Sequence, residues 1–177
     1  EALRDDKVAA LLQKRVIATH RLKSAAPASF LARIGVLLGE GTQEQTEAMG
    51  NYFEALGISF QIIDDTLNLK GFKDNLKTKG EDITAGKITY PIAKAMALLT
   101  KPDRKRLWEI VSAKTSDMKL IKEAVALLDK VKAIEICERE AKTILERAWK
   151  KVNPLLRDSM VKLNLRAFSW FVLERTY

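Results

Sequence analysis

An all-α fold is predicted by three features of the 177-residue sequence. Apolar residues recur at the three- and four-residue spacing of an amphipathic helix along most of the chain. Only eight Gly and four Pro are present, too few for the many tight turns of an all-β architecture. Hydrophobic residues make up 47% and charged residues 31% of the chain, which supports a single folded domain with a substantial core.

The N-terminal half contains two long predicted helices, residues 25–38 and 44–68, separated by the turn formers of residues 39–42. The second helix would be about 25 residues long, beyond the usual range, and polar residues interrupt its apolar face. Residues 69–87 break the pattern, because they hold three Gly, five Lys and three acidic residues without helical periodicity. A long polar loop inside a compact helical protein is commonly functional.

Four further helices are predicted: residues 102–113, 117–132, 134–152 and a last helix opened by Pro154. Pro102 falls in the first turn of its helix, where a missing N–H costs little. The expected core residues of this helix are Leu107, Trp108, Ile110 and Val111. Residues 168–172 are apolar for the end of a chain, and we expect them to pack against the bundle or a second subunit.

Composition and charge exclude several classes of protein. A single cysteine, Cys137, excludes an internal disulfide framework and a cysteine-rich zinc site. No apolar run approaches the roughly 18–20 residues of a transmembrane helix. The net charge of +8 favours anionic partners, but the basic residues are spread over many helices, so we expect no nucleic-acid partner. The chain begins at Glu1 rather than Met, and its native N-terminus is therefore expected to lie upstream.

Two adjacent carboxylates, Asp64 and Asp65, lie within the apolar part of the second helix. Burying them without cationic partners would be costly. Phe60, Asp64 and Asn68 follow one another at intervals of four residues and therefore share one helix face. Carboxylate and amide oxygens suit Mg²⁺, which keeps several waters and is shared with substrate phosphates. The alternative interpretation is that both aspartates form structural ion pairs.

The polar loop adds cations close to this acidic pair. Lys77 and Lys87 lie on a glycine-containing segment whose backbone allows close approach to a ligand. Carboxylates that hold a metal, next to ammonium groups that neutralise the remaining charge, are the requirements of a diphosphate–Mg²⁺ site. The alternative is an ordinary solvated, lysine-rich loop.

These residues resemble the trans-isoprenyl diphosphate synthases (polyprenyl synthetases). The segment Phe60-Gln61-Ile62-Ile63-Asp64-Asp65 resembles the second aspartate-rich motif of that family. Lys77 and residues 80–91 resemble the segment that follows it, and Lys23-Ser24 resembles the upstream Lys-Thr pair. The resemblance extends from Lys23 to Met96.

The resemblance implies the all-α isoprenoid synthase bundle and a prenyltransferase that condenses an allylic diphosphate with isopentenyl diphosphate. By this likeness, Asp64 and Asp65 would bind Mg²⁺, and diphosphate would be released. Three lysines would act on the allylic diphosphate as catalytic and substrate-binding groups: Lys23, Lys77 and Lys87. Gln61 would line the substrate site, and Phe60 would face the cavity, where an aromatic ring stabilises cationic carbon.

Two departures from the family pattern change the expectation. Asn68 replaces a third aspartate, a form similar to that of some geranylgeranyl diphosphate synthases. The first aspartate-rich motif is absent, because Asp5-Asp6 lies too close to Lys23 to serve. Residues 1–177 are therefore expected to be the C-terminal part of a single isoprenoid synthase domain, and to be inactive alone. A complementary N-terminal half, on the same polypeptide or on another chain, would complete the site, and family members are usually homodimers.

Other interpretations stay open from the sequence. A non-catalytic regulatory subunit of a prenyl synthase would share these motifs, and a class I terpene cyclase would share the fold and the metal chemistry. Cyclases lack the loop motif that contains Lys87, which favours the synthase. A cytoplasmic location is expected.

Overall fold

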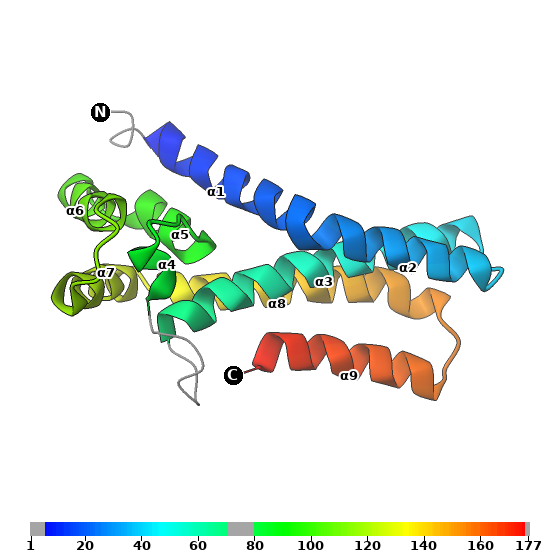
Figure 1. Cartoon of the computed structure of the whole chain (residues 1–177). Helices are drawn as coiled ribbons and strands as arrows, with labels where there is room; N and C mark the ends of the chain where they lie inside the picture. Colours follow the sequence, from blue (N-terminus) through cyan, green and yellow to red (C-terminus); the bar gives the residue numbers. More distant parts are fainter. Residues whose placement is uncertain (1–5, 71–79, 176–177) are drawn as a thin grey trace. The chain divides into compact units, whose positions relative to one another are not determined.

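The computed structural model describes residues 6–70 and 80–175, and every regular element within them is helical, which confirms the predicted all-α class (Figure 1). The α-helices are α1 (Asp6–His20), α2 (Ala26–Leu38), α3 (Gln43–Lys70), α4 (Glu81–Thr84), α5 (Tyr90–Leu98), α6 (Lys101–Ser112), α7 (Met118–Lys130), α8 (Ala133–Val152) and α9 (Met160–Glu174). A π-helical turn (Arg21–Ala25) joins α1 directly to α2, and a 3₁₀ turn (Asn153–Leu155) follows α8. Among these described helices, none has both the length and the apolar character needed to cross a membrane.

Five of the predicted helices occur close to their expected bounds, as α2, α3, α6, α7 and α8. The prediction for the last helix is wrong at its start. Pro154 lies in the 3₁₀ turn, and the extended backbone of Leu156 then interrupts the helical path. Helix α9 begins only after Ser159, whose side chain accepts a hydrogen bond from the backbone amide of Lys162 at 3.2 Å. A serine cap, rather than a proline, therefore opens this helix.

The chain forms two compact units. The first contains residues 6–17, 64–70 and 80–138, and the second contains residues 18–63 and 139–175. Helix α3 runs through the boundary, so Asp64 begins the part of α3 that belongs to the first unit. The candidate site residues are accordingly divided between the units, and each unit is described separately below.

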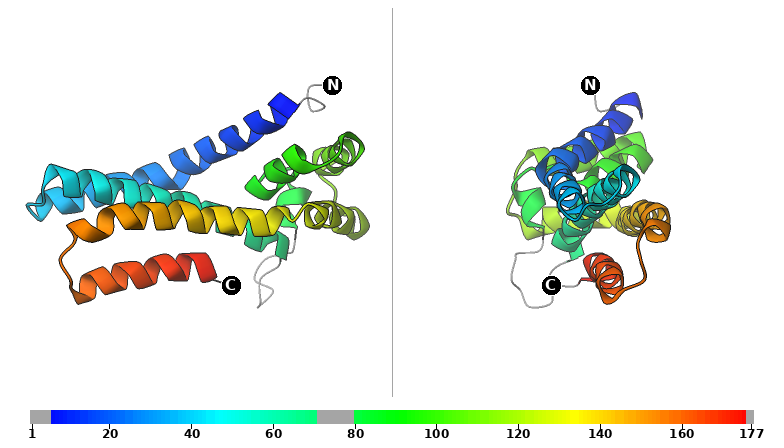
Figure 2. Two further views of the ribbon diagram at one scale, coloured as in Figure 1. Left: turned by 180° about the vertical axis from the view of Figure 1, so that it is seen from behind. Right: turned by 90° about the vertical axis from the view of Figure 1, so that its right-hand side faces the viewer.

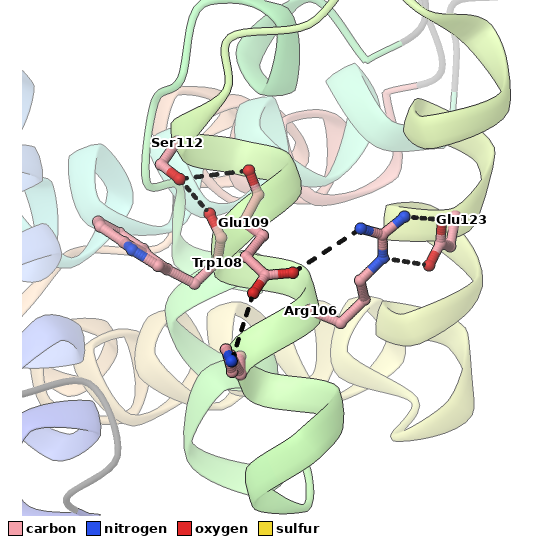
Figure 3. Close-up of polar contacts among 6 residues, drawn as sticks. Arg106, Trp108, Glu109, Ser112 and Glu123 are labelled. Atoms are coloured by element: carbon pink, nitrogen blue, oxygen red, sulfur yellow. Dashed lines mark hydrogen bonds and ion pairs between the residues drawn. The ribbon is translucent and has the colours of Figure 1, made fainter. Parts of the chain in front are cut away.

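The first unit is built around an apolar core that α5, α6 and α7 share. Leu107, Ile110 and Val111 are fully buried as expected, and Trp108 is half-buried at the edge of this core. Outside the core, Arg106 donates to both carboxylate oxygens of Glu123 at 2.6 and 2.8 Å (Figure 3). This exposed bidentate pair links α6 to α7 and leaves the apolar faces of both helices to make the core.

The second unit places α8 beside α3 and α9 (Figure 2). Ser59 of α3 donates to the backbone oxygen of Ala141 in α8 at 2.9 Å, a buried hydrogen bond. One apolar core cluster of this unit contains Tyr52, Leu56, Leu145, Val152 and Val172. The predicted packing of residues 168–172 is found for one face only, since Ser169 and Val172 are buried whereas Phe168, Trp170 and Phe171 are exposed.

Candidate metal and diphosphate site

The acidic pair lies near the C-terminal end of α3, and its two carboxylates have different surroundings. Asp64 is half-buried, whereas Asp65 is only 2% exposed. Adjacent residues of an α-helix point about 100° apart, so one side chain of such a pair faces inward when the other reaches the surface. Asn68, one turn after Asp64, is also buried.

The carboxylate of Asp65 lies at the N-terminus of α5. Its Oδ2 accepts a hydrogen bond from the backbone amide of Tyr90, the first residue of α5, at 2.9 Å. Its Oδ1 lies 3.8 Å from Nζ of Lys87. The positive end of the helix dipole and the ammonium group both stabilise a buried carboxylate, so Asp65 is charge-compensated despite its burial.

Lys87 joins the acidic pair to a third carboxylate. Its Nζ donates to Oδ1 of Asp82 at 3.1 Å, and its backbone amide donates to the carbonyl oxygen of Asp82 at 2.8 Å. Desolvation lowers the pKa of Lys87, but the hydrogen bond to Asp82 and the charges of Asp82, Asp65 and Asp64 outweigh it, and the pKa lies above its ordinary value. Lys87 is therefore a cation at neutral pH, and its side chain is half-exposed.

Asn68 holds the start of α4. Its side-chain Oδ1 accepts a hydrogen bond from the amide of Asp82 at 3.1 Å, and its carbonyl oxygen accepts one from the amide of Gly80 at 3.0 Å. Gly80 has a φ of +80°, a conformation that glycine adopts without strain. In the sequence Asn68 stands out only as a candidate oxygen ligand for a metal, and its anchoring role at α4 is visible only in the structure. No local sequence pattern indicates that Asn68 accepts this hydrogen bond, since the donor residue Asp82 lies 14 residues further along the chain.

The other candidate residues lie elsewhere. Lys23 is exposed on the π-helical turn, and Gln61 is buried on α3, both in the second unit. Phe60, also in the second unit, packs at the edge of its apolar core and carries the guanidinium of Arg175 over its ring. Lys77 lies outside the described residues. The structure thus brings Asp64, Asp65, Asp82 and Lys87 together within the first unit.

The donor set of this cluster fits part of a magnesium site. Within residues 6–70 and 80–175, no group of three or more His, Cys, Asp or Glu side chains is arranged to hold a metal ion by itself. Mg²⁺ does not require such a cage, because it is commonly held by one or two carboxylates, several waters and the phosphates of a substrate. Hard carboxylate oxygens beside a lysine are compatible with that mode of binding.

Comparison with known proteins places the chain in a family. The family model for polyprenyl synthetase matches residues 4–128, more than half of the chain, and the chain belongs to this family. The chain is 30% identical over 156 residues to a short chain isoprenyl diphosphate synthase of Methanothermobacter thermautotrophicus. The matched region covers 88% of this chain and 47% of that relative. It is 41% identical over 73 residues to geranylgeranyl pyrophosphate synthase 3, chloroplastic, of Arabidopsis thaliana, covering 41% of this chain and 20% of that protein.

Solved structures of prenyl diphosphate synthases share the fold of this chain. A geranylgeranyl pyrophosphate synthetase from Pyrococcus horikoshii superposes with a TM-score of 0.82 and 25% identity, covering 98% of this chain and 55% of that one. A decaprenyl diphosphate synthase from Rhodobacter capsulatus superposes with a TM-score of 0.80 and 26% identity, covering 97% of this chain and 56% of that one. The expected isoprenoid synthase fold is therefore confirmed, and the chain spans about half the length of these relatives.

Proposed function

We propose that this chain supplies the second metal and diphosphate half-site of a prenyltransferase that condenses an allylic diphosphate with isopentenyl diphosphate. The observation that carries the proposal is the cluster of Asp64, Asp65 and Asp82 around the charged Lys87. A bare acidic cluster would repel a diphosphate, and a bare lysine would not hold a metal. Their combination suits a diphosphate that arrives with Mg²⁺.

In this reaction the C–O bond of the allylic diphosphate breaks and its electron pair leaves with the diphosphate. The double bond of isopentenyl diphosphate forms the new C–C bond, and a proton is then lost. Mg²⁺, when bound beside Asp64 and Asp65, supplies Lewis-acid stabilisation of the leaving group. The ammonium of Lys87, whose pKa lies above its ordinary value, adds a fixed positive charge where negative charge develops.

The remaining residues have roles proposed from the family resemblance. Lys23 and Lys77 would contact the diphosphate of the allylic substrate, and Gln61 would line the site. Phe60 would lie beside the allylic carbons, where its ring face stabilises developing positive charge.

A complementary N-terminal half is part of the proposal. The relatives and solved structures contain about as much chain again as the part that this chain matches. An N-terminal half that carries the first aspartate-rich motif would complete the metal cluster, either on the same polypeptide or on a partner chain. Without it we expect the 177 residues to bind Mg²⁺ with diphosphate but not to turn over substrate.

Two measurements test the function. Calorimetric titration of the chain with inorganic diphosphate should show binding that depends on Mg²⁺ and falls at least about tenfold in Lys87→Met. The matched control is Lys119→Met, because Lys119 is exposed on α7 and should leave the affinity unchanged. An incorporation assay with both diphosphate substrates should show no product from the chain alone. Binding that is independent of Mg²⁺, or equal losses in both variants, would contradict the proposed site.

A further inference from the structure

The lysine of the proposed diphosphate site is carried by a short segment that rests against the end of α6. Gly86 directly precedes Lys87 and lies beside Lys114, the residue that follows the C-cap of α6. We propose that Lys114 is a positioning residue: the hydrocarbon stem of its exposed side chain covers Gly86 and so fixes the segment that carries Lys87. The inference rests on the proposed function and gives a part in it to a residue outside the charged cluster.

The contact between Lys114 and Gly86 occupies the space where another residue would have a side chain. A Cβ added to Gly86 would lie 2.7 Å from Cγ of Lys114 and 3.1 Å from its Cε. Carbon atoms in contact are normally about 3.5–4.0 Å apart, so the lysine stem packs directly on the glycine backbone. The carbonyl oxygen of Val111, in the last turn of α6, would lie 3.2 Å from the same Cβ. The end of α6 therefore closes on Gly86 with both backbone and side-chain atoms.

Lys114 adopts a backbone conformation that lysine rarely adopts. Its φ is +49°, in the left-handed region, and it occupies the position after a helix C-cap where glycine is the usual residue. Glycine would remove the strain of this conformation but could not reach Gly86. The stem contact is therefore an interaction that only a long side chain at this position supplies.

The backbone at Gly86 sets the path of Lys87. Gly86 has a φ of +69°, and its amide donates to the carbonyl oxygen of Ile83 at 2.9 Å. Ile83 is fully buried in the apolar core of the first unit. The amide of Lys87 then donates to the carbonyl oxygen of Asp82 at 2.8 Å, and its Nζ lies 3.1 Å from Oδ1 of the same residue. The segment is thus held by the core on one side and by Lys114 on the other, which restricts where Lys87 can lie.

Three variants separate the stem of Lys114 from its charge and from its backbone strain. Lys114→Met keeps an unbranched stem and removes only the ammonium group. Lys114→Gly removes the stem and relieves the left-handed strain. Lys132→Gly is the matched control, because Lys132 is also exposed, has a φ of +52° and follows the C-cap of α7.

Two readouts are compared: hydrogen exchange of the Gly86 and Lys87 amides by NMR, and the affinity for Mg²⁺ with inorganic diphosphate by calorimetry. Lys114→Gly should speed exchange at both amides and weaken the affinity at least about tenfold, because small displacements of a binding group are costly. Lys114→Met should keep both amides protected and the affinity within about threefold of wild type, since an exposed charge contributes little. Lys132→Gly should change neither readout.

Thermal unfolding shows whether a loss of affinity comes from loss of the fold. Neither glycine variant should lower the Tm by more than about 2 °C, because glycine removes strain at a left-handed position. Gly86→Ala approaches the same contact from the other side, since its Cβ would push the stem of Lys114 away. It should speed exchange at the Lys87 amide and weaken the affinity as Lys114→Gly does.

The proposal is overturned if Lys114→Met weakens the affinity as much as Lys114→Gly, because Lys114 would then act through its charge. It is also overturned if Lys114→Gly leaves exchange of the Lys87 amide at the wild-type rate, or if Lys132→Gly weakens the affinity equally. Failure of wild type to bind the probe would contradict the proposed function instead. The exchange contrast needs no ligand and would still decide whether Lys114 holds the segment.

Discussion

The guanidinium carbon of Arg175 lies 3.8 Å from the centre of the Phe60 ring, and its Nη2 donates to the carbonyl oxygen of Phe60 at 3.1 Å. These two contacts attach the residue after α9 to α3, directly before Gln61 and the acidic pair. One face of the Phe60 ring is thereby in contact with a cation of the protein itself. No local sequence pattern indicates this pairing, because the two residues are 115 positions apart.

Arg175→Ala should destabilise the second unit. A partly desolvated cation–π contact is worth about 1–2 kcal/mol, and a hydrogen bond from a charged donor adds to it. We therefore expect a loss of about 2 kcal/mol in the free energy of unfolding, measured by urea denaturation, and a smaller loss in Arg175→Lys. Arg157→Ala, at an exposed position, is the control and should change little. Equal losses in Arg175→Ala and Arg157→Ala would contradict the role of the Phe60 contact.

Two glycines of the second unit should respond oppositely to alanine. A Cβ on Gly57 of α3 would lie 2.6 Å from Cα of Ala25, so the two backbone segments would have to separate. Gly57→Ala should therefore cost about 1–3 kcal/mol. A Cβ on Gly35 of α2 would meet nothing within 4 Å, and Gly35→Ala should stabilise by about 0.5–1 kcal/mol through helix propensity. Thermal unfolding of the two variants, each compared with wild type, measures both effects. If Gly57→Ala were as stable as wild type, α3 would not pack this closely against Ala25.

Asn68 should tolerate aspartate better than alanine. Asn68→Ala removes the acceptor for the Asp82 amide and should cost about 1 kcal/mol, with faster hydrogen exchange at that amide. Asn68→Asp retains an acceptor at the same position and should keep the amide protected. If both variants left the exchange rate at the wild-type value, Asn68 would not be the anchor of α4.

The contribution of Lys87 to stability should vanish at high pH. Its folded-state pKa lies above the ordinary value of 10.5, so its charged form stabilises the fold. This contribution is fully present below 10.5 and is lost as the pH rises through the folded-state value. The free energy of unfolding of wild type should therefore exceed that of Lys87→Met by a constant amount between about pH 7 and 9. The difference should shrink once the pH rises above the ordinary lysine pKa of 10.5. A difference that stays constant up to the highest pH measured would contradict a stabilising role of the Lys87 charge.

Amphipathic spacing predicted α6, α7 and α8 well, because their apolar residues lie on one face and the core covers that face. The start of α9 was mispredicted because Pro154 suits the first turn of a 3₁₀ helix as well as that of an α-helix. The sequence predicts an irregular segment over residues 69–87, whereas α3 continues to Lys70 and the short helix α4 lies near the end of the segment. Helix α4 has too few residues for any periodicity to show, and residues 71–79 lie outside the described residues.

The site was predictable in its residue types and less so in its geometry. The acidic pair and Lys87 were identified together, and the structure does bring them together within one unit. The difference in burial between Asp64 and Asp65 could have been inferred from the sequence, since adjacent residues on a helix with one buried face point in different directions. The hydrogen-bond partner of Asp65 could not be inferred, because it is a backbone amide 25 residues away, and every residue except proline has such an amide.

The π-helical turn at residues 21–25 gives this part of the chain an unusual sensitivity to length. A π turn contains more residues than a turn of α-helix, and removing a single residue would allow the run from α1 to α2 to continue as a regular α-helix. Lys23 would then be re-aimed by about 100° around the helix axis relative to α2. Exchanges of exposed side chains such as Leu22 should be tolerated here, whereas one-residue deletions should not. The direction of this lysine is therefore encoded in the spacing of the chain and not in the chemistry of its neighbours.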